Sequence, residues 1–183
     1  MGKPLNILIA EDSQDDADLV LAQLRHAGFD PKWKRVEVEA DFLSEVKKSP
    51  DIIISDYSMP EFSGLRAAEI LQESGLNIPF ILISGTVGED IAVQAMKYGA
   101  TDYFLKDRTA RLGSAVEHAL EQKLLRDERI RADEEIKNQL QELQRWHEAM
   151  LGREDRVLEL KREVNELLAR LKQPPRYDEA SKP

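Results

Sequence analysis

The chain contains no cysteine, which excludes disulfide bonds and thiolate zinc sites and fits a reducing, cytoplasmic setting. No apolar run approaches the roughly 18 residues that a membrane-spanning helix needs, and the first residues lack the apolar segment of a secretory signal. Basic residues number 26 against 35 acidic ones, and the net charge of −9 disfavours non-specific binding to nucleic acid. We therefore expect a cytoplasmic protein that binds neither membrane nor nucleic acid.

Proline and glycine are scarce in the last third of the chain. Residues 113–172 hold no proline and only two glycines, Gly113 and Gly152. Acidic residues outnumber basic ones by 19 to 12 in residues 1–112, but only by 16 to 14 in the rest. A length of 183 residues allows one compact domain with an appendage. These features predict an acidic N-terminal domain followed by a densely charged, solvated helix.

Short apolar runs alternate with amphipathic stretches from Leu5 to about Leu105. Buried parallel strands read as continuous apolar runs, whereas the stretches between them carry apolar residues at helical spacing. The alternation predicts an α/β domain with a doubly wound, mostly parallel sheet of five strands. The expected strands are 6–10, 32–38, 52–55, 79–83 and 102–105.

Four of these strands run into residues that suit phosphoryl chemistry: Glu11 with Asp12, Asp56, Ser84 and Lys106. Taken singly, an acidic pair after a strand usually marks the start of a helix, and an Asp at a strand end is mostly a turn residue. Open α/β sheets, however, place their sites beyond the carboxyl ends of the strands. The combination therefore predicts one cluster at one edge of the sheet.

The predicted cluster matches the needs of a carboxylate that accepts a phosphoryl group. Such transfer depends on positioning and on neutralising charge. Magnesium prefers a few carboxylates together with water and substrate oxygens, which Glu11, Asp12 and Asp56 would supply. Lys106 would place a positive charge against a phosphoryl oxygen, and Ser84 would donate a hydrogen bond to another.

Residues 4 to about 121 resemble the receiver domain of bacterial two-component response regulators. The resemblance implies a flavodoxin-like sheet with strand order 2-1-3-4-5. It also implies that a sensor histidine kinase or phosphotransfer protein donates the phosphoryl group, with transfer and dephosphorylation self-catalysed. The matching segments are Ile9-Ala10-Glu11-Asp12, Asp56 to Gly64, Ile83-Ser84-Gly85 and Gly99 to Lys106.

By this resemblance Asp56 is the phosphoacceptor. Glu11, Asp12, Asp56 and the backbone carbonyl of Ser58 would hold Mg²⁺ as the cofactor. One alternative function is a magnesium-dependent aspartyl phosphatase or transferase. Such enzymes usually carry an Asp two residues after the nucleophile, and Ser58 at that position argues against this alternative. A second alternative is a pseudo-receiver that is never phosphorylated and serves as a scaffold, which the intact acidic cluster disfavours.

The resemblance also implies that Lys106 contacts the phosphoryl group, that Ser84 is the switch hydroxyl, and that the rotamer of Tyr103 follows Ser84. The sequence departs from the family's commonest pattern at two positions. Asp107 stands where receivers usually have a proline after a cis peptide, so a trans peptide and a different loop are expected. Gly85 stands where alanine is usual, which predicts a looser loop after the fourth strand.

The C-terminal segment carries apolar residues at the alternating spacings of three and four that are typical of coiled coils. The two runs differ in register, and the break falls near Gly152. Either the coil contains a stammer there, or the chain turns back as a hairpin that packs only on itself. We name these residues the seam: Ile136, Leu140, Leu143, Met150, Val157, Leu160, Val164, Leu167 and Leu171.

The sequence thus predicts a receiver domain over residues 1–121, a coiled-coil segment over 122–172 and a disordered tail over 173–183. The seam resembles connector segments of multidomain signalling proteins and predicts a homodimer. Residues after 113 show no basic helix-turn-helix, so a downstream protein effector is expected in place of DNA.

Overall fold

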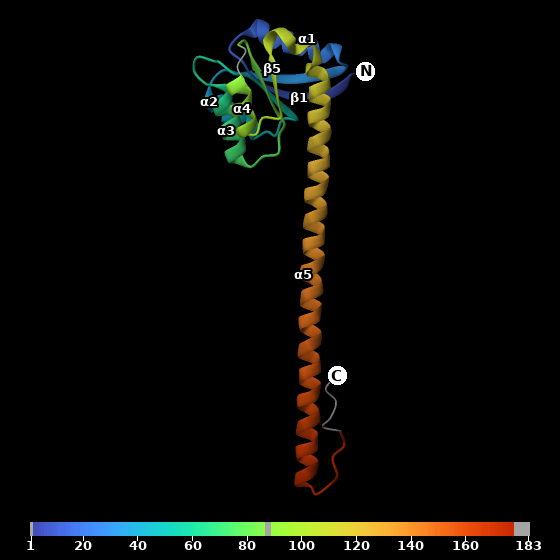
Figure 1. Cartoon of the computed structure of the whole chain (residues 1–183). Helices are drawn as coiled ribbons and strands as arrows, with labels where there is room; N and C mark the ends of the chain where they lie inside the picture. Colours follow the sequence, from blue (N-terminus) through green and yellow to red (C-terminus); the bar gives the residue numbers. More distant parts are fainter. Residues whose placement is uncertain (1, 87–88, 178–183) are drawn as a thin grey trace. The chain divides into compact units, whose positions relative to one another are not determined.

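The structure is a computed structural model that describes residues 2–86 and 89–177. Five parallel strands form a single sheet in the order β2-β1-β3-β4-β5 (Figure 1). This order confirms the predicted doubly wound, flavodoxin-like sheet. The strands are β1 (Lys3–Ala10), β2 (Phe29–Val36), β3 (Ile52–Asp56), β4 (Phe80–Ser84) and β5 (Asp102–Leu105).

Helices follow the strands in alternation, and two of them begin at a serine cap. The Ser13 and Ser63 hydroxyls accept hydrogen bonds from the backbone N–H groups of Asp16 and Arg66, which satisfies donors that a first helical turn leaves free. The helices are α1 (Gln14–His26), α2 (Glu39–Val46), α3 (Gly64–Ser74), α4 (Glu89–Lys97) and α5 (Leu112–Arg170), with a short 3₁₀ segment η1 (Lys106–Arg111) before α5.

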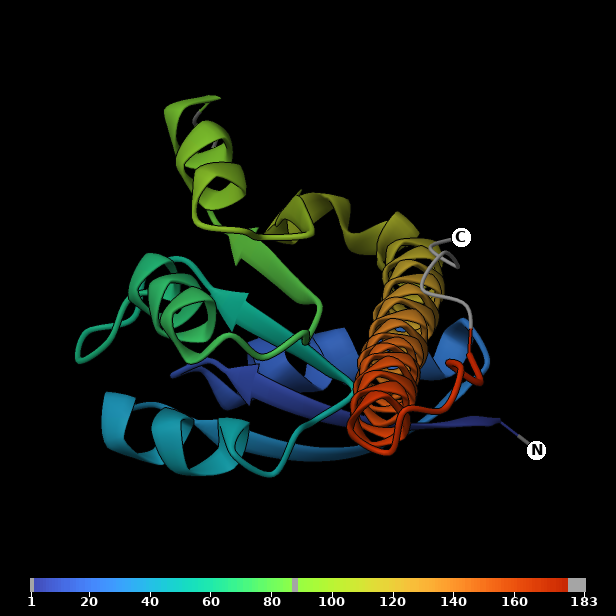
Figure 2. The same cartoon turned by 90° about the horizontal axis from the view of Figure 1, so that it is seen from below.

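The sheet buries a separate apolar core on each face. On one face, residues such as Leu8, Ile53 and Leu82 pack with buried residues of α2, α3 and α4. On the other face, residues such as Ile54 and Ile81 pack with buried residues of α1 and the first turns of α5. Figure 2 shows the sheet between these two groups of helices. Burial on both faces explains why the central strands are continuous apolar runs.

Strand β2 starts earlier than the sequence indicated, at Phe29 and not at 32. It lies at the edge of the sheet, and only its two ends, Phe29 and Val36, are buried. Between them it carries charged residues and Pro31, which an edge strand tolerates because one side needs no ladder hydrogen bond. The strand therefore lacks the apolar run that revealed the other four.

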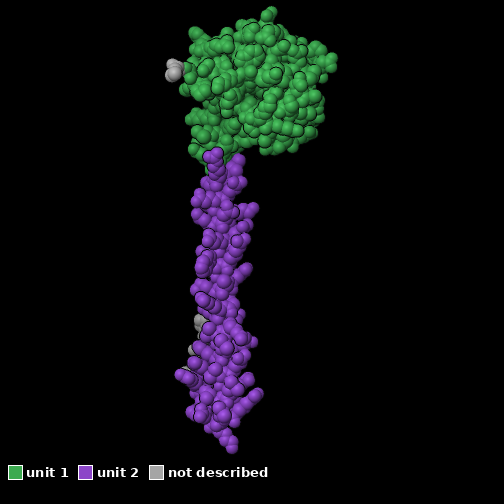
Figure 3. Space-filling model, turned by 180° about the vertical axis from the view of Figure 1, so that it is seen from behind, with its two compact units in different colours: residues 1–128 green, residues 129–183 purple. Residues whose placement is uncertain are grey.

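The chain divides into two compact units, residues 1–128 and 129–183, drawn in different colours in Figure 3. The boundary lies inside α5, seven residues after the end that the sequence suggested for the domain. Helix α5 runs through Gly152 without interruption, so the hairpin alternative for the register break does not describe this structure. None of the helices in the described residues is long and apolar enough to cross a membrane.

Residues up to Tyr177, expected to be disordered, fold back along the end of α5. The Asn165 side chain accepts hydrogen bonds from the backbone N–H groups of Arg176 and Tyr177 and donates one to the Tyr177 carbonyl. The Lys161 ammonium lies 5.9 Å from the centre of the Tyr177 ring. The rest of the expected disordered tail, 178–183, lies outside the described residues.

Candidate functional site

The predicted site residues stand at the carboxyl ends of four neighbouring strands. Glu11 and Asp12 follow β1, Asp56 ends β3, Ser84 ends β4 and Lys106 follows β5. Parallel strands share one direction, so these ends all lie at one edge of the sheet. The structure brings Glu11, Asp12, Asp56 and Lys106 together, whereas the Ser84 hydroxyl binds Thr86.

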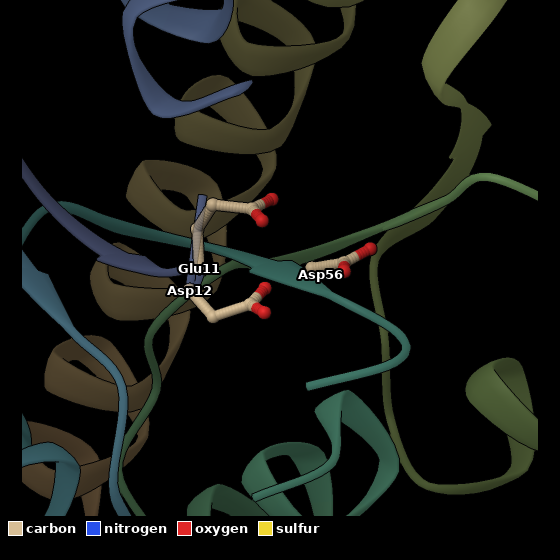
Figure 4. A group of neighbouring side chains, drawn as sticks. All are labelled: Glu11, Asp12 and Asp56. Atoms are coloured by element: carbon tan, nitrogen blue, oxygen red, sulfur yellow. The ribbon is translucent and has the colours of Figure 1, made fainter. Parts of the chain in front are cut away.

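Three carboxylates converge at the centre of this edge (Figure 4). One oxygen from each of Glu11, Asp12 and Asp56 lies within 4.8 Å of the others. Glu11 and Asp56 are buried, with 4% and 6% of their surface exposed, whereas Asp12 is exposed. A few hard carboxylate oxygens, one of them on an exposed side chain, are the kind of ligand that Mg²⁺ prefers, since it keeps several water ligands. The residues therefore fit a magnesium ion.

The backbone that carries the two acidic residues of β1 is held by Arg35 of β2. Its guanidinium donates hydrogen bonds to the carbonyl oxygens of Glu11 and Asp12, at 2.9 and 3.0 Å. The Glu11 carboxylate also accepts a hydrogen bond of 3.2 Å from the Ser13 backbone N–H. These contacts fix the backbone of Glu11 and Asp12 and the direction of the Glu11 carboxylate.

Burial and nearby negative charge make the Glu11 and Asp56 carboxylates resist ionisation. Burial, with a further contribution from Asp56, raises the pKa of Glu11 from 4.5 to about 7, although Ser13 and Lys106 oppose the shift. Burial also raises the pKa of Asp56, while the charge and hydrogen bond of Lys106 and the Tyr57 backbone N–H partly offset it. The site therefore carries more negative charge than its surroundings stabilise.

The Lys106 ammonium lies among three carboxylates. Its Nζ is 2.5 Å from Asp16 Oδ2, 3.2 Å from Glu11 Oε2 and 3.3 Å from Asp56 Oδ2. Burial by itself would lower the pKa of Lys106, but the hydrogen bond to Asp16 and the charges of Asp56 and Glu11 outweigh it and raise the pKa. Lys106 is therefore a permanent positive charge beside Asp56. The Lys106–Asp107 peptide is trans.

Ser84 and Tyr103 meet at one backbone group. The Ser84 hydroxyl donates to the Thr86 carbonyl at 3.1 Å and accepts from the Thr86 N–H at 3.2 Å. The Tyr103 hydroxyl donates to the same Thr86 carbonyl at 3.1 Å. Ser84 is buried. Because both hydroxyls bind the Thr86 carbonyl, a change in the hydrogen bonds of Ser84 can reach Tyr103 through this one residue.

Glycine at position 64 is required by the close approach of α3 to the site. A Cβ at Gly64 would overlap the backbone carbonyl of Asp56 and the side chain of Leu82. The Gly64 N–H donates to the Tyr57 carbonyl at 3.1 Å, which closes the loop that contains Ser58. Ser58 itself is exposed, and its carbonyl as a metal ligand stays a prediction.

Sequence reasoning missed three residues of the site: Asp16, Arg35 and Thr86. Asp16 did carry a signal, because it precedes the buried Val20 by four positions and so shares its helix face, whereas Asp15 shares a face with the exposed Leu19. Arg35 and Thr86 carried none: Arg35 acts by binding backbone carbonyls distant in sequence, and Thr86 acts through its own backbone groups, which its residue type does not reveal.

Comparison with known proteins agrees with this arrangement. Residues 7–117, more than half of the chain, match the response regulator receiver domain family. The response regulator protein TodT of Pseudomonas putida is 39% identical over 119 residues, which cover 64% of this chain and 49% of TodT. TmoT of Ectopseudomonas mendocina is 39% identical over 154 residues, 83% of this chain and 66% of that protein.

Solved structures show the same fold. The receiver domain of a putative LuxO repressor protein from Vibrio parahaemolyticus matches with a TM-score of 0.61 at 26% identity, covering 68% of this chain and 95% of that one. A receiver domain protein from Clostridium thermocellum matches with a TM-score of 0.58 at 26% identity, over 66% and 98%. The chain spans about half the length of TodT. The family match, the fold and the acidic edge together show that this chain belongs to the response regulator receiver domains of two-component systems.

Proposed function

We propose that this chain accepts a phosphoryl group on Asp56 from a sensor histidine kinase or a phosphotransfer protein, in a Mg²⁺-dependent reaction. The observation that carries the proposal is the position of Asp56. It ends the central strand β3 and is buried; two further carboxylates lie close to it, and the Lys106 ammonium is 3.3 Å from its Oδ2. The reaction is self-catalysed, because the receiver supplies the positioning and charge that transfer needs.

The two oxygens of Asp56 have different surroundings, which suits one of them to attack. Oδ1 accepts a hydrogen bond of 2.9 Å from the Tyr57 N–H, which fixes the carboxylate. Oδ2 faces Lys106 and would form the new bond to phosphorus as the bond to the donor's leaving group breaks. Glu11, Asp12, Asp56 and the Ser58 carbonyl would hold Mg²⁺, which neutralises charge on the transferring oxygens.

The same proposal gives Ser84 and Tyr103 the switch. A phosphoryl group on Asp56 adds strong acceptor oxygens. If the Ser84 hydroxyl turns to donate to one of them, it gives up the Thr86 carbonyl that Tyr103 also binds. The Thr86 carbonyl is then no longer held in place for the Tyr103 hydroxyl. Tyr103 can therefore change rotamer, which alters the surface of β5.

Intact-mass measurement after incubation with a small acyl phosphate and Mg²⁺ tests the phosphoacceptor. We expect one phosphoryl group per chain in wild type and none in Asp56→Asn, because the amide keeps the shape but is not a nucleophile. Asp107→Asn is the matched control, since it removes an exposed carboxylate next to Lys106 and outside the acidic cluster. An adduct of equal yield in Asp56→Asn would contradict the assignment.

For the second unit we propose a homodimer through the seam. Apolar seam residues remain exposed along α5 and just after its end; Leu143 in the helix and Leu171 directly after it, for example, are each 69% exposed. A helix that exposes a regular apolar stripe gains stability by burying it against a partner, and heptad spacing suits a second copy of the same stripe. The 154 residues matched in TmoT exceed the 128 of the first unit, so that similarity extends into this segment.

Light scattering of matched leucine variants tests the dimer. Leu160 belongs to the seam and Leu158 does not, although both are partly exposed on the same helix, at 44% and 37%. We expect a dimer in wild type and in Leu158→Lys, and a monomer in Leu160→Lys, because a lysine at the seam places two like charges in an apolar interface. A monomeric wild type at tens of micromolar would contradict the proposal.

Output through a downstream protein effector, without nucleic acid, stays a prediction.

A further inference from the structure

The nearest partner of Lys106 is a carboxylate outside the acidic cluster. Asp16 Oδ2 lies 2.5 Å from the Lys106 ammonium, closer than Glu11 or Asp56. The group that brings three carboxylates together for a metal consists of Glu11, Asp12 and Asp56 and does not include Asp16. Asp16 thus binds the lysine without offering a ligand to the ion.

The place of Asp16 is fixed by the start of α1. It lies in the first helical turn, where its backbone N–H donates to the Ser13 hydroxyl at 3.3 Å. Both side chains of the pair are partly covered, with 35% of Asp16 and 29% of Lys106 exposed. An ion pair with this cover is screened less by solvent than an exposed one.

Building on the proposed magnesium site, we infer that Asp16 is a positioning residue that holds the Lys106 ammonium beside the acidic cluster and thereby sets the affinity for Mg²⁺. Without the ion, Lys106 contacts Glu11 and Asp56, the carboxylates that the ion needs. Lys106 and Mg²⁺ therefore compete for the same oxygens. Asp16 keeps a negative partner for Lys106 when the ion takes over the other two.

Loss of the Asp16 charge acts on both sides of this equilibrium. In the metal-free protein, Lys106 would interact more closely with Glu11 and Asp56 and would be harder to displace. In the metal-bound protein, the ion would occupy Glu11 and Asp56, and Lys106 would have no carboxylate partner left once the charge of Asp16 is removed. Both effects weaken binding, and both require Lys106. A long-range attraction between Asp16 and the ion would also weaken binding when lost, but it would not depend on Lys106.

A double-mutant cycle on the full chain separates the two explanations, with Mg²⁺ binding measured by calorimetry at fixed pH. Asp16→Asn should weaken binding at least about threefold, which is at the low end of the coupling between contacting residues. In a Lys106→Met background, Asp16→Asn should change the affinity little. Asp15→Asn, which removes an exposed charge from the same helical turn, should bind as wild type does. Asp16→Glu should restore most of the affinity.

Two results would overturn the inference alone: an equal loss from Asp16→Asn in both backgrounds, or no loss in either. A wild type that binds no Mg²⁺ at millimolar concentration would overturn the metal site together with it. Unfolding curves of the variants without metal show whether each one is folded. If Asp16→Asn does not fold, Asp16→Ser takes its place, because it keeps a small polar side chain but removes the charge.

Discussion

We expect Glu11 to make Mg²⁺ binding at the proposed site depend on pH near neutrality. The pKa of Glu11 is raised to about 7, first by burial and then by Asp56, against the opposing effects of the Ser13 N–H and Lys106. Metal ligands must be deprotonated, so Mg²⁺ binding has to release the proton that Glu11 carries below this pKa. We therefore expect the affinity for Mg²⁺ to rise with pH up to about 7 and to level off above it.

The size of the effect follows from the fraction of Glu11 that is ionised. With a pKa of about 7, roughly a tenth of the molecules carry the carboxylate at pH 6 and roughly nine tenths at pH 8. The affinity should therefore fall about tenfold between pH 8 and pH 6. An ordinary glutamate, with a pKa of 4.5, would give almost no change over this range.

Calorimetry in two buffers of different ionisation enthalpy measures both the affinity and the protons released. Close to one proton per ion should be released at pH 6 and close to none at pH 8. Glu11→Gln, which cannot titrate, should bind more weakly than wild type at pH 8 and show little dependence on pH. A wild-type affinity that is flat from pH 6 to pH 8, with no proton release, would refute the reasoning.

The same shift predicts how metal-free stability varies with pH. The pKa of Glu11 is higher in the folded chain than in the unfolded one, so the folded state binds more protons between pH 4.5 and about 7. Its contribution to stability is present below pH 4.5 and is lost as pH rises through about 7. Glu11→Gln should therefore raise the free energy of unfolding at pH 8, by up to roughly 3 kcal/mol, and change it little at pH 4.5. Urea denaturation in a chelator measures this, and equal effects at both pH values would contradict it.

Three further substitutions test the loop, the long helix and the switch. Gly64→Ala should lower the free energy of unfolding by about 1–3 kcal/mol, because the added methyl group overlaps the Asp56 carbonyl. Gly152→Ala, which meets open space within α5, should stabilise that helix by about 1 kcal/mol; circular dichroism during urea denaturation follows both. Ser84→Ala should still be phosphorylated, but NMR shifts of Tyr103 should respond less than in wild type; an equal response would exclude Ser84 as the switch.

Much of the fold was predictable because the central strands are buried on both faces. Continuous apolar runs identified the central strands β1, β3 and β4, and a shorter run identified the edge strand β5; the residues after each run then identified the edge that carries the site. Strand β2 was misplaced by three residues for the opposite reason, since an edge strand with Pro31 and several charges has no such run. The seam was predictable as a pattern, but its continuity through Gly152 was not, because a single glycine fits both a helix and a turn.

The contacts of the site were harder to predict than its members. Lys106 was expected to contact a phosphoryl group on Asp56. Its nearest partner in the structure is instead Asp16, in the first turn of α1. Sequence order cannot give such a contact, because it depends on how α1 packs against the sheet. The helical spacing from Asp16 to the buried Val20 was the one available signal, and it distinguishes Asp16 from its exposed neighbour Asp15.

One imbalance of charge connects these properties of the site. Three carboxylates, from Glu11, Asp16 and Asp56, lie around the ammonium of Lys106, and Asp12 adds a fourth to the acidic cluster; Glu11 and Asp56 are buried. The metal-free protein reduces the excess by keeping a proton on Glu11 up to about pH 7. A bound divalent cation would reduce the excess negative charge without the proton on Glu11. It would thereby favour the ionised, nucleophilic form of Asp56. We therefore expect the same imbalance of charge to favour both the binding of a divalent cation and the transfer of a phosphoryl group to Asp56.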